Sequence, residues 1–196
     1  MTVAALYVET GGVYFGLEDV DPWDEARDAR LYAGPYPVVA HPPCARWSRF
    51  AGFTESRFGL MRGDDGGCFA AALAAVEEYG GVIEHPAYSA AWDAFGLVKP
   101  RTHHGWTLSL LSGGASAYVE QGRYGLPVKK ATWLYAHGLP HLPDLRWGYT
   151  PDSESHPDTR WPQEGADDRE EMPRALRPKR SESRSEAVVD VLAEES

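Results

Sequence analysis

The segment "DDGGCFAAALAAVEEYGGVIEH", Asp64–His85, joins a helix pattern directly to a strand pattern. Apolar residues fill positions 69–76, and the pair Gly80 and Gly81 predicts the end of the helix. The apolar "VIEH" follows at once and reads as a buried strand. A helix that runs straight into a buried strand is typical of an α/β layer.

Four other segments have strand patterns, and they extend this layer in both directions. They are "VAALYV" (3–8), "PYPVVAH" (35–41), "SAYVEQ" (116–121) and "ATWLYAHG" (131–138). Strands that alternate with helices predict an α/β fold with a mainly parallel sheet. Active sites of such sheets lie at the carboxyl ends of the strands. The segments His41–Cys44 and Glu84–Pro86 are expected at those ends.

The chain of 196 residues divides by composition into three parts. We expect a compact α/β domain over 1–142, a polar, Pro-rich linker or loop over 143–180, and a C-terminal helix over 181–196. No apolar run is long enough for a membrane-spanning helix, so no membrane partner is expected. The two cysteines are too few for a disulfide framework, which favours a cytoplasmic setting.

The formal charge of −10 is divided unevenly, with −4 over residues 1–148 and −6 over 149–196. An acidic chain does not hold duplex DNA by overall attraction, so any nucleic-acid contact needs a local basic patch. The basic run in "PRALRPKRSESR" (173–184) is one such patch. A solvated run without a partner explains it equally well.

Four short motifs stand in a fixed order along residues 3–138. They are "LYVETGGVYFGLE" (6–18), "PPCARWS" (42–48), "VIEHP" (82–86) and "YGLPVKKAT" (124–132). Taken together, they resemble a compact, phage-like and reduced form of the cytosine-C5 DNA methyltransferase family. That family has a glycine loop after its first strand, then Pro-Pro-Cys, Glu-Asn-Val and Tyr-Gly-x-Pro-Gln-x-Arg-x-Arg.

The resemblance implies a Rossmann-like methyltransferase layer of reduced size that uses S-adenosylmethionine. It implies Cys44 as nucleophile, Glu84 as the residue that contacts the base, and Lys130 in place of the first family arginine, with Thr132 at the second. It places the cofactor at Gly11, Gly12 and Glu18. The residues that it places around the substrate are His41, Pro43, Arg46, Ser48, His85, Arg123 and Tyr124.

The chemistry of this family explains why such residues would stand together. Addition of the Cys44 thiolate to carbon 6 of cytosine makes carbon 5 nucleophilic toward a methyl sulfonium. Glu84 would hold the proton of the ring nitrogen, and Lys130 or Arg123 would hold the base carbonyl or a phosphate. A base in duplex DNA must leave its stack to reach such a pocket, whereas a single strand or a free nucleotide needs no such step.

Three departures from the family bear on the expected cofactor and substrate. Residues 13–37 are too few for the cofactor half of the family, which points to weak cofactor binding or a different cofactor. Residues 139–180 are too short and polar for a target-recognition domain, and the net charge is negative, which together favour a small substrate, a single strand or a partner protein. The expected partner is therefore DNA or a pyrimidine nucleotide, with a second protein as a possible source of target recognition. The alternatives are a catalytically degenerate protein that binds nucleic acid or a host protein, and an enzyme of free pyrimidine nucleotides.

Several residues have simpler interpretations. Cys68 fits a small core residue in the alanine-rich helix. No second cysteine follows Pro43-Cys44 at the spacing of zinc deaminases, so no metal is expected. The carboxylates in 18–28 fit a solvated loop or one helix that begins at Pro22, although one of them is a candidate for the cofactor ribose.

Overall fold

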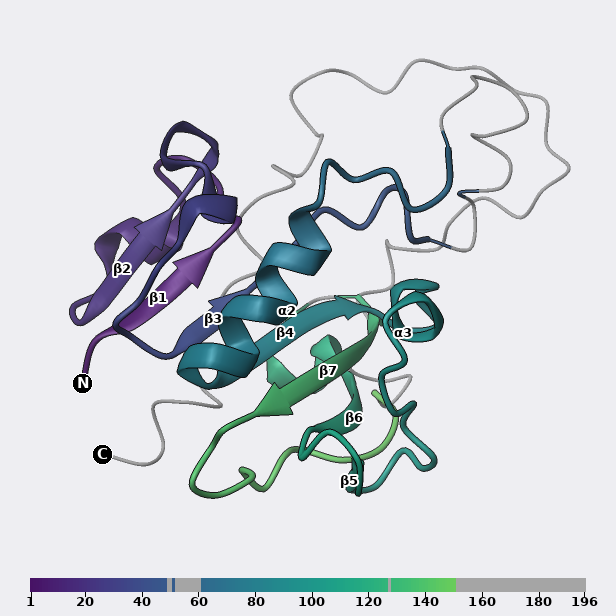
Figure 1. Cartoon of the computed structure of the whole chain (residues 1–196). Coiled ribbons are helices and arrows are strands. Elements are labelled where there is room, and N and C mark those ends of the chain that lie inside the picture. Colours follow the sequence, from purple (N-terminus) through teal and green to yellow (C-terminus); the bar gives the residue numbers. More distant parts are fainter. Residues whose placement is uncertain (49–50, 52–60, 127, 151–196) are drawn as a thin grey trace, which may run out of the picture.

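The computed structural model describes residues 1–48, 51, 61–126 and 128–150 of the chain. Their strands form one seven-stranded sheet in the order β2-β1-β3-β4-β7-β6-β5 (Figure 1). The strands are β1 (Val3–Leu6), β2 (Val20–Trp23), β3 (Val38–Ala40), β4 (Gly81–Pro86), β5 (Trp106–Leu108), β6 (Ala115–Glu120) and β7 (Ala131–His137).

The sheet is parallel at one end and antiparallel at the other. Strand β1 pairs in parallel with β2 and β3, and β3 pairs in parallel with β4. Strand β7 is antiparallel to both β4 and β6, and β5 is antiparallel to β6. The predicted α/β class is confirmed, but the sheet is mixed because the short connection 121–130 reverses the chain between β6 and β7, whereas a parallel connection needs about a dozen residues or more.

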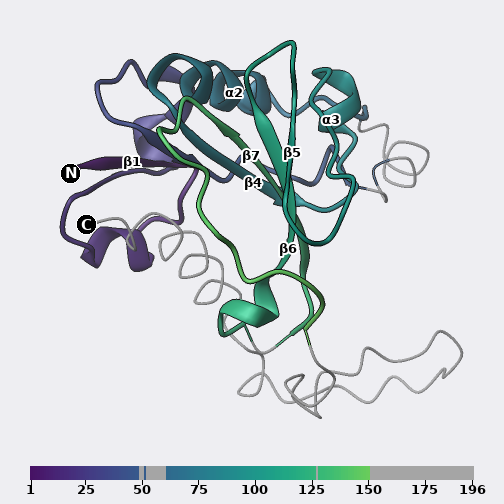
Figure 2. The same cartoon turned by 90° about the horizontal axis from the view of Figure 1, so that it is seen from below.

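The opening segment folds into the helix and strand that its pattern predicts. Helix α2 covers Cys68–Tyr79, and β4 begins at Gly81. Gly81 has φ +135°, and a Cβ on it would lie 1.9 Å from the carbonyl oxygen of Val38. Only glycine therefore allows β4 to approach β3 so closely directly after the helix. Figure 2 shows α2 and the short α3 (Ala91–Ala94) on the same face of the sheet.

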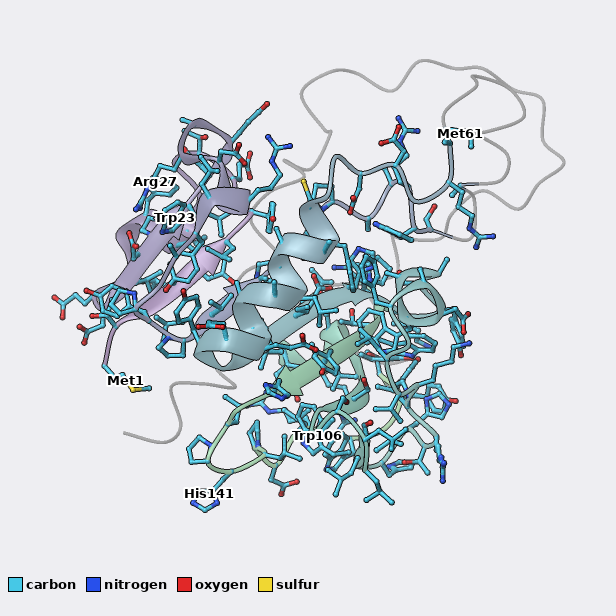
Figure 3. The ribbon with its side chains drawn as sticks, in the orientation of Figure 1. Met1, Trp23, Arg27, Met61, Trp106 and His141 are labelled. Carbon is cyan, nitrogen blue, oxygen red and sulfur yellow. The ribbon has the colours of Figure 1, made fainter. Side chains whose placement is uncertain are left out.

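The acidic segment before β3 contains a strand where the sequence favoured a loop or a helix that begins at Pro22. Strand β2 includes Pro22 and lies at the edge of the sheet, where a missing backbone donor is tolerated. The short 3-10 turns η2 (Glu25–Arg27) and η3 (Ala29–Leu31) follow it. The Arg27 guanidinium lies 4.0 Å from the ring centroid of Trp23 and covers this edge (Figure 3).

The face of the sheet opposite α2 is covered by residues that follow β7. Leu145 is buried there, and the indole of Trp106 donates to the carbonyl of Pro143 at 2.9 Å. The first part of the predicted linker, up to Thr150, therefore packs on the domain. The basic run and the predicted C-terminal helix lie outside the described residues. Within the described ranges, no helix has the length and apolarity needed to cross a membrane.

Candidate active site

One edge of the sheet gathers the ends of five strands. The carboxyl ends of β1, β3, β4 and β6 meet there with the amino end of β7, because β7 runs against its neighbours. The chain leaves β1 toward β2 on one side and returns to β3 on the other, so strand order reverses between β1 and β3. Open α/β sheets bind ligands in the crevice at such a reversal.

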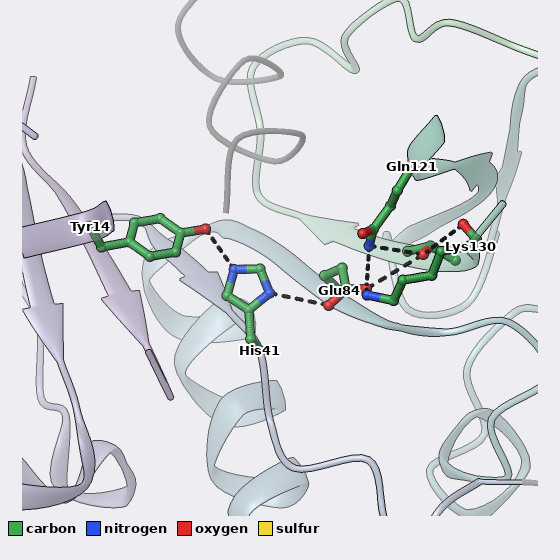
Figure 4. Close-up of polar contacts among 6 residues, drawn as sticks. Tyr14, His41, Glu84, Gln121 and Lys130 are labelled. Carbon is green, nitrogen blue, oxygen red and sulfur yellow. Dashed lines mark hydrogen bonds and ion pairs between the residues drawn. The ribbon is translucent and has the colours of Figure 1, made fainter. Parts of the chain in front are cut away.

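Glu84 is the centre of a hydrogen-bond network at this edge, and only 3% of it is exposed. Its Oε1 lies 2.9 Å from Gln121 Nε2, 3.2 Å from Lys130 Nζ and 3.5 Å from the Thr132 hydroxyl. Its Oε2 lies 3.2 Å from His41 Nδ1 (Figure 4). Residues in or next to the ends of β3, β6 and β7 therefore converge on one carboxylate of β4.

The donors around Glu84 keep it ionised. Burial alone would raise the pKa of Glu84, but the His41 hydrogen bond and the charge of Lys130 outweigh burial and lower that pKa below its ordinary value. A buried carboxylate is tolerable only with such partners. An ionised Glu84 accepts hydrogen bonds, so it suits a ligand that presents N–H groups.

Tyr14 extends the network to the loop that follows β1. Its hydroxyl lies 2.7 Å from His41 Nε2, and Tyr14 belongs to the 3-10 turn η1 (Val13–Gly16). Burial, and then the charge of Glu84, raise the pKa of Tyr14, so the phenol keeps its proton. Because an ionised Glu84 only accepts, Nδ1 of His41 is the donor to it, and Nε2 of the neutral imidazole accepts a hydrogen bond from the Tyr14 hydroxyl. The chain Tyr14–His41–Glu84 spans the point where strand order reverses (Figure 4).

Cys44 lies in the turn directly after β3, three residues beyond His41. Its carbonyl accepts from the amide of Trp47 at 3.0 Å, and its side chain is half-buried. Trp47 anchors this turn, because its ring packs on Phe69 and its indole donates to Asp65 at 2.7 Å. The turn also carries three other predicted substrate residues, Pro43, Arg46 and Ser48.

The other predicted substrate residues are placed differently. His85 points to the opposite face of the sheet from Glu84, where its ring lies 5.3 Å from that of Phe69. Adjacent residues of a strand face opposite ways, so the structure does not bring His85 to the Glu84 network. Arg123 and Tyr124 lie in η4 (Gln121–Tyr124), where they contact residues 146 and 149.

The predicted cofactor residues lie at opposite edges of the sheet. Gly11, with φ +70°, and Gly12 follow β1 at the candidate edge. Glu18 is exposed and lies at the other edge, next to the start of β2, because the chain crosses the sheet before β2 begins. The structure therefore does not bring Glu18 to the glycines.

Asp24 directly follows β2, at the same edge of the sheet as the glycines. Its carboxylate accepts from the Thr10 hydroxyl at 2.7 Å and from the amides of Ala26 and Arg27. The Thr10 hydrogen bond holds the pKa of Asp24 below its ordinary value. Asp24 was one of several carboxylates that the sequence left undistinguished, and its position beside the glycine loop now sets it apart.

Gln121 and Tyr14 are the members of the network that had no predicted role, although Tyr14 lies within the first motif. Gln121 is buried, and its amide nitrogen donates to Glu84 and to Thr132 at 2.9 and 3.0 Å. Its Oε1 is buried and has no hydrogen-bond partner among the described residues. The position of Gln121 at the end of a predicted strand was the only signal that could have indicated it.

No family model matches the sequence, and no curated protein matches it. Among the described residues, no three or more His, Cys, Asp and Glu side chains are grouped as a metal site would require. The function is therefore argued from the arrangement of the edge alone. That arrangement consists of a cysteine turn, a glycine loop and an ionised carboxylate held between them.

Proposed function

We propose that this chain is an S-adenosylmethionine-dependent enzyme with a Rossmann-like methyltransferase layer, which methylates carbon 5 of cytosine in DNA, or of a related pyrimidine, through Cys44. The observation that carries the proposal is the network around Glu84. Glu84 and Lys130 belong to two different motifs and His41 directly precedes a third, yet His41 and Lys130 both contact Glu84. Cys44 stands in the turn that His41 begins.

Glu84 has the chemistry that base recognition requires. An ionised carboxylate accepts from the exocyclic amine of cytosine and from its ring nitrogen once that nitrogen carries a proton. Lys130 has its Nζ 3.2 Å from Glu84 and keeps other ammonium hydrogens for the base carbonyl. The network is held before any ligand arrives, so little rearrangement is needed on binding.

The reaction is a nucleophilic addition followed by an elimination. The Cys44 thiolate would form a bond to carbon 6 of the base, and the electron pair displaced from the bond between carbons 5 and 6 would be stabilised as the ring nitrogen takes a proton from solvent, a proton that the ionised Glu84 holds by accepting its hydrogen bond. Carbon 5 would then bond to the methyl group while the methyl–sulfonium bond breaks and its electron pair stays on sulfur. Transfer of the carbon-5 proton to water and expulsion of the thiolate would restore the ring and free Cys44.

The glycine loop has features that fit the cofactor. S-adenosylmethionine would supply the methyl group as a sulfonium, and Gly11 and Gly12 would let the backbone approach it closely. Nothing lies within 4 Å of a Cβ built on Gly11, so this side of the loop is open. The carboxylate of Asp24, which Thr10 joins to the same loop, is suited to accept from ribose hydroxyls.

The proposal is tested by methyl transfer with a trapping substrate. The full chain is incubated with S-adenosylmethionine bearing a labelled methyl group and with oligonucleotides that contain cytosine or 5-fluorocytosine. We expect label in cytosine, and a covalent adduct with 5-fluorocytosine, because fluorine on carbon 5 cannot leave as a proton does. Cys44→Ala should abolish both products.

Cys68→Ala is the matched control for the thiol. Burial, and then the charge of Asp65, raise the pKa of Cys68, which opposes formation of a thiolate there. The Cys68 variant should therefore transfer label at the wild-type rate. Full methyl transfer by Cys44→Ala, or no rise in melting temperature with S-adenosylmethionine, would contradict the proposal.

A further inference from the structure

Two exposed tyrosines pack over other aromatic rings at the same edge of the sheet as the candidate active site, but on the face that carries α2 and His85, opposite the face of Glu84. Tyr88 is 53% exposed and Tyr149 is 59% exposed. The ring of Tyr88 lies 5.3 Å from that of Trp133, and the ring of Tyr149 lies 4.9 Å from that of His103. We call the five residues Tyr88, His103, Tyr118, Trp133 and Tyr149 the tyrosine platform.

The floor of the platform is rigid. Tyr118 and Trp133 are buried register partners on β6 and β7, and they point to the same face of the sheet. The ring of His103 meets that of Tyr118 edge-on at 4.0 Å, and Tyr118 donates to Glu120 at 3.0 Å. Tyr88 therefore rests on a side chain of the sheet, and Tyr149 rests on His103, which in turn packs on Tyr118 of the sheet.

The platform is joined to the Cys44 turn and to the strand ends near Glu84, although Glu84 itself points to the other face. The amide of Ala90 donates to the carbonyl of Trp47 at 3.0 Å, which places the segment of Tyr88 beside the Cys44 turn. The amide of Ala87 donates to the carbonyl of Ala131 at 3.0 Å, so the chain just before Tyr88 is tied to the residue that follows Lys130. The amide of Thr150 donates to Glu120 at 2.7 Å, which ties Tyr149 to the residue before Gln121.

Tyr88 also has a costly backbone conformation. Its φ is +65°, in the left-handed region that residues with a side chain seldom adopt. Strain of this kind concentrates at functional sites, where the position of a side chain matters. Here the conformation presents a large ring to solvent beside the Cys44 turn, whereas a ring that served only packing would be expected to be buried.

Positive charge gathers in the part of the chain that carries most of the platform. Residues 95–150 contain six Lys and Arg and two Asp and Glu, whereas residues 1–94 contain six and fourteen. Several of these cations come close to the platform in sequence or space. Arg101 precedes His103 by two residues, Arg123 donates to the carbonyl of Tyr149 at 3.4 Å, and Lys129 precedes Lys130.

We propose that the tyrosine platform binds single-stranded DNA by stacking bases on Tyr88 and Tyr149, while the nearby cations contact the phosphates. Exposed aromatic rings among basic side chains are the common design of proteins that bind single strands. In a duplex, the faces of the bases are already stacked on each other. This inference rests on the proposed function, because it names the form in which the cytosine reaches Glu84.

Equilibrium binding tests the platform without any need for methyl transfer. Fluorescence anisotropy is measured on the full chain with a labelled 12-nucleotide single strand and with the corresponding duplex. Tyr88→Ala and Tyr149→Ala should each weaken single-strand binding about tenfold or more, because each variant loses the binding free energy of one stacked base. Tyr88→Phe and Tyr149→Phe should bind like the wild type, because they keep the ring.

Tyr36→Ala is the matched control, since Tyr36 is also exposed but precedes β3 at the opposite edge of the sheet. It should leave single-strand binding unchanged. Lys129→Gln should reduce the dependence of log K on log salt concentration by a little under one unit. Melting temperatures of all variants are measured in parallel, so that a loss of binding is not confused with unfolding.

Two results would overturn the platform. One is wild-type affinity in both alanine variants, and the other is a wild-type chain that binds the duplex as tightly as the single strand. The proposed function fails in a different way. If the alanine variants lose single-strand binding but no chain transfers methyl groups, the platform stands and the enzymatic proposal falls.

Discussion

The Tyr14 hydroxyl lies 2.7 Å from Nε2 of His41 and joins the loop after β1 to the turn after β3. Because His41 also contacts Glu84 at 3.2 Å, one tyrosine links the glycine loop to the buried carboxylate. In the proposed enzyme these two sites hold the methyl donor and the base. Binding of the methyl donor at the glycine loop would therefore affect Glu84 through these two hydrogen bonds.

Tyr14→Phe removes one of these hydrogen bonds and leaves the ring in place. We expect a loss of about 1–2 kcal/mol in the free energy of unfolding, because the buried Nε2 of His41 loses its donor. Urea denaturation measures this loss. Tyr36→Phe, at an exposed position, should unfold like the wild type. Equal stability of the Tyr14 and Tyr36 variants would show that the contact with His41 does not contribute.

Lys130 and Glu84 should be coupled energetically. Lys130→Met leaves the buried carboxylate with one fewer positive neighbour, and we expect a loss of about 1–2 kcal/mol, discounted because a quarter of the Lys130 side chain is exposed. The same substitution made in a Glu84→Gln background should cost clearly less. A double-mutant cycle from urea denaturation gives the difference, and additive losses would argue against the ion pair.

The low pKa of Glu84 predicts how stability depends on pH. In the unfolded chain Glu84 has a pKa of about 4.3, whereas in the fold it stays ionised at lower pH. Its contribution to the free energy of unfolding is therefore complete above about pH 4.3. As pH falls below about 4.3, the unfolded state takes up the proton first, and this contribution is lost. The stability gap between the wild type and Glu84→Gln should therefore shrink from pH 7 to pH 3. A gap independent of pH would contradict an ionised Glu84.

Much of the fold follows from patterns that are local in the sequence. The apolar run and glycine pair of α2 predict its limits, and Glu84 is predicted at a carboxyl strand end because it closes an apolar segment. The opposite orientation of His85 also follows from strand alternation, although its place in a motif suggested a site residue. Local pattern thus located Glu84 but misplaced its neighbour.

Other features depend on contacts that a local pattern does not contain. Strand β2 is hard to recognise in the sequence because it contains Pro22 and carboxylates. It forms by pairing in parallel with β1. Glu18 is placed away from Gly11 for the same reason, since the chain must cross the sheet to start β2. Gln121 has no motif of its own, and only the pairing of β6 with β7 brings it to Glu84.

Gln121→Glu tests whether the network tolerates a second carboxylate. Nε2 of Gln121 lies 2.9 Å from Oε1 of Glu84, so the variant brings a second carboxylate next to that of Glu84. Like charges at this distance raise the pKa of one of the pair well above its ordinary value. We expect a loss of stability of about 2–3 kcal/mol at pH 7, where both groups would be charged.

The loss caused by Gln121→Glu, like that caused by Glu84→Gln, becomes smaller as pH falls. The cause differs, because here protonation in the fold relieves a repulsion. The folded pair binds a proton at a pH where the unfolded chain does not, so the Gln121→Glu variant gains stability relative to Gln121→Leu as pH falls from 7 toward 5. Gln121→Leu removes the same amide without adding charge and is the matched control. Parallel stability curves for the two variants over this range would show that position 121 does not face Glu84.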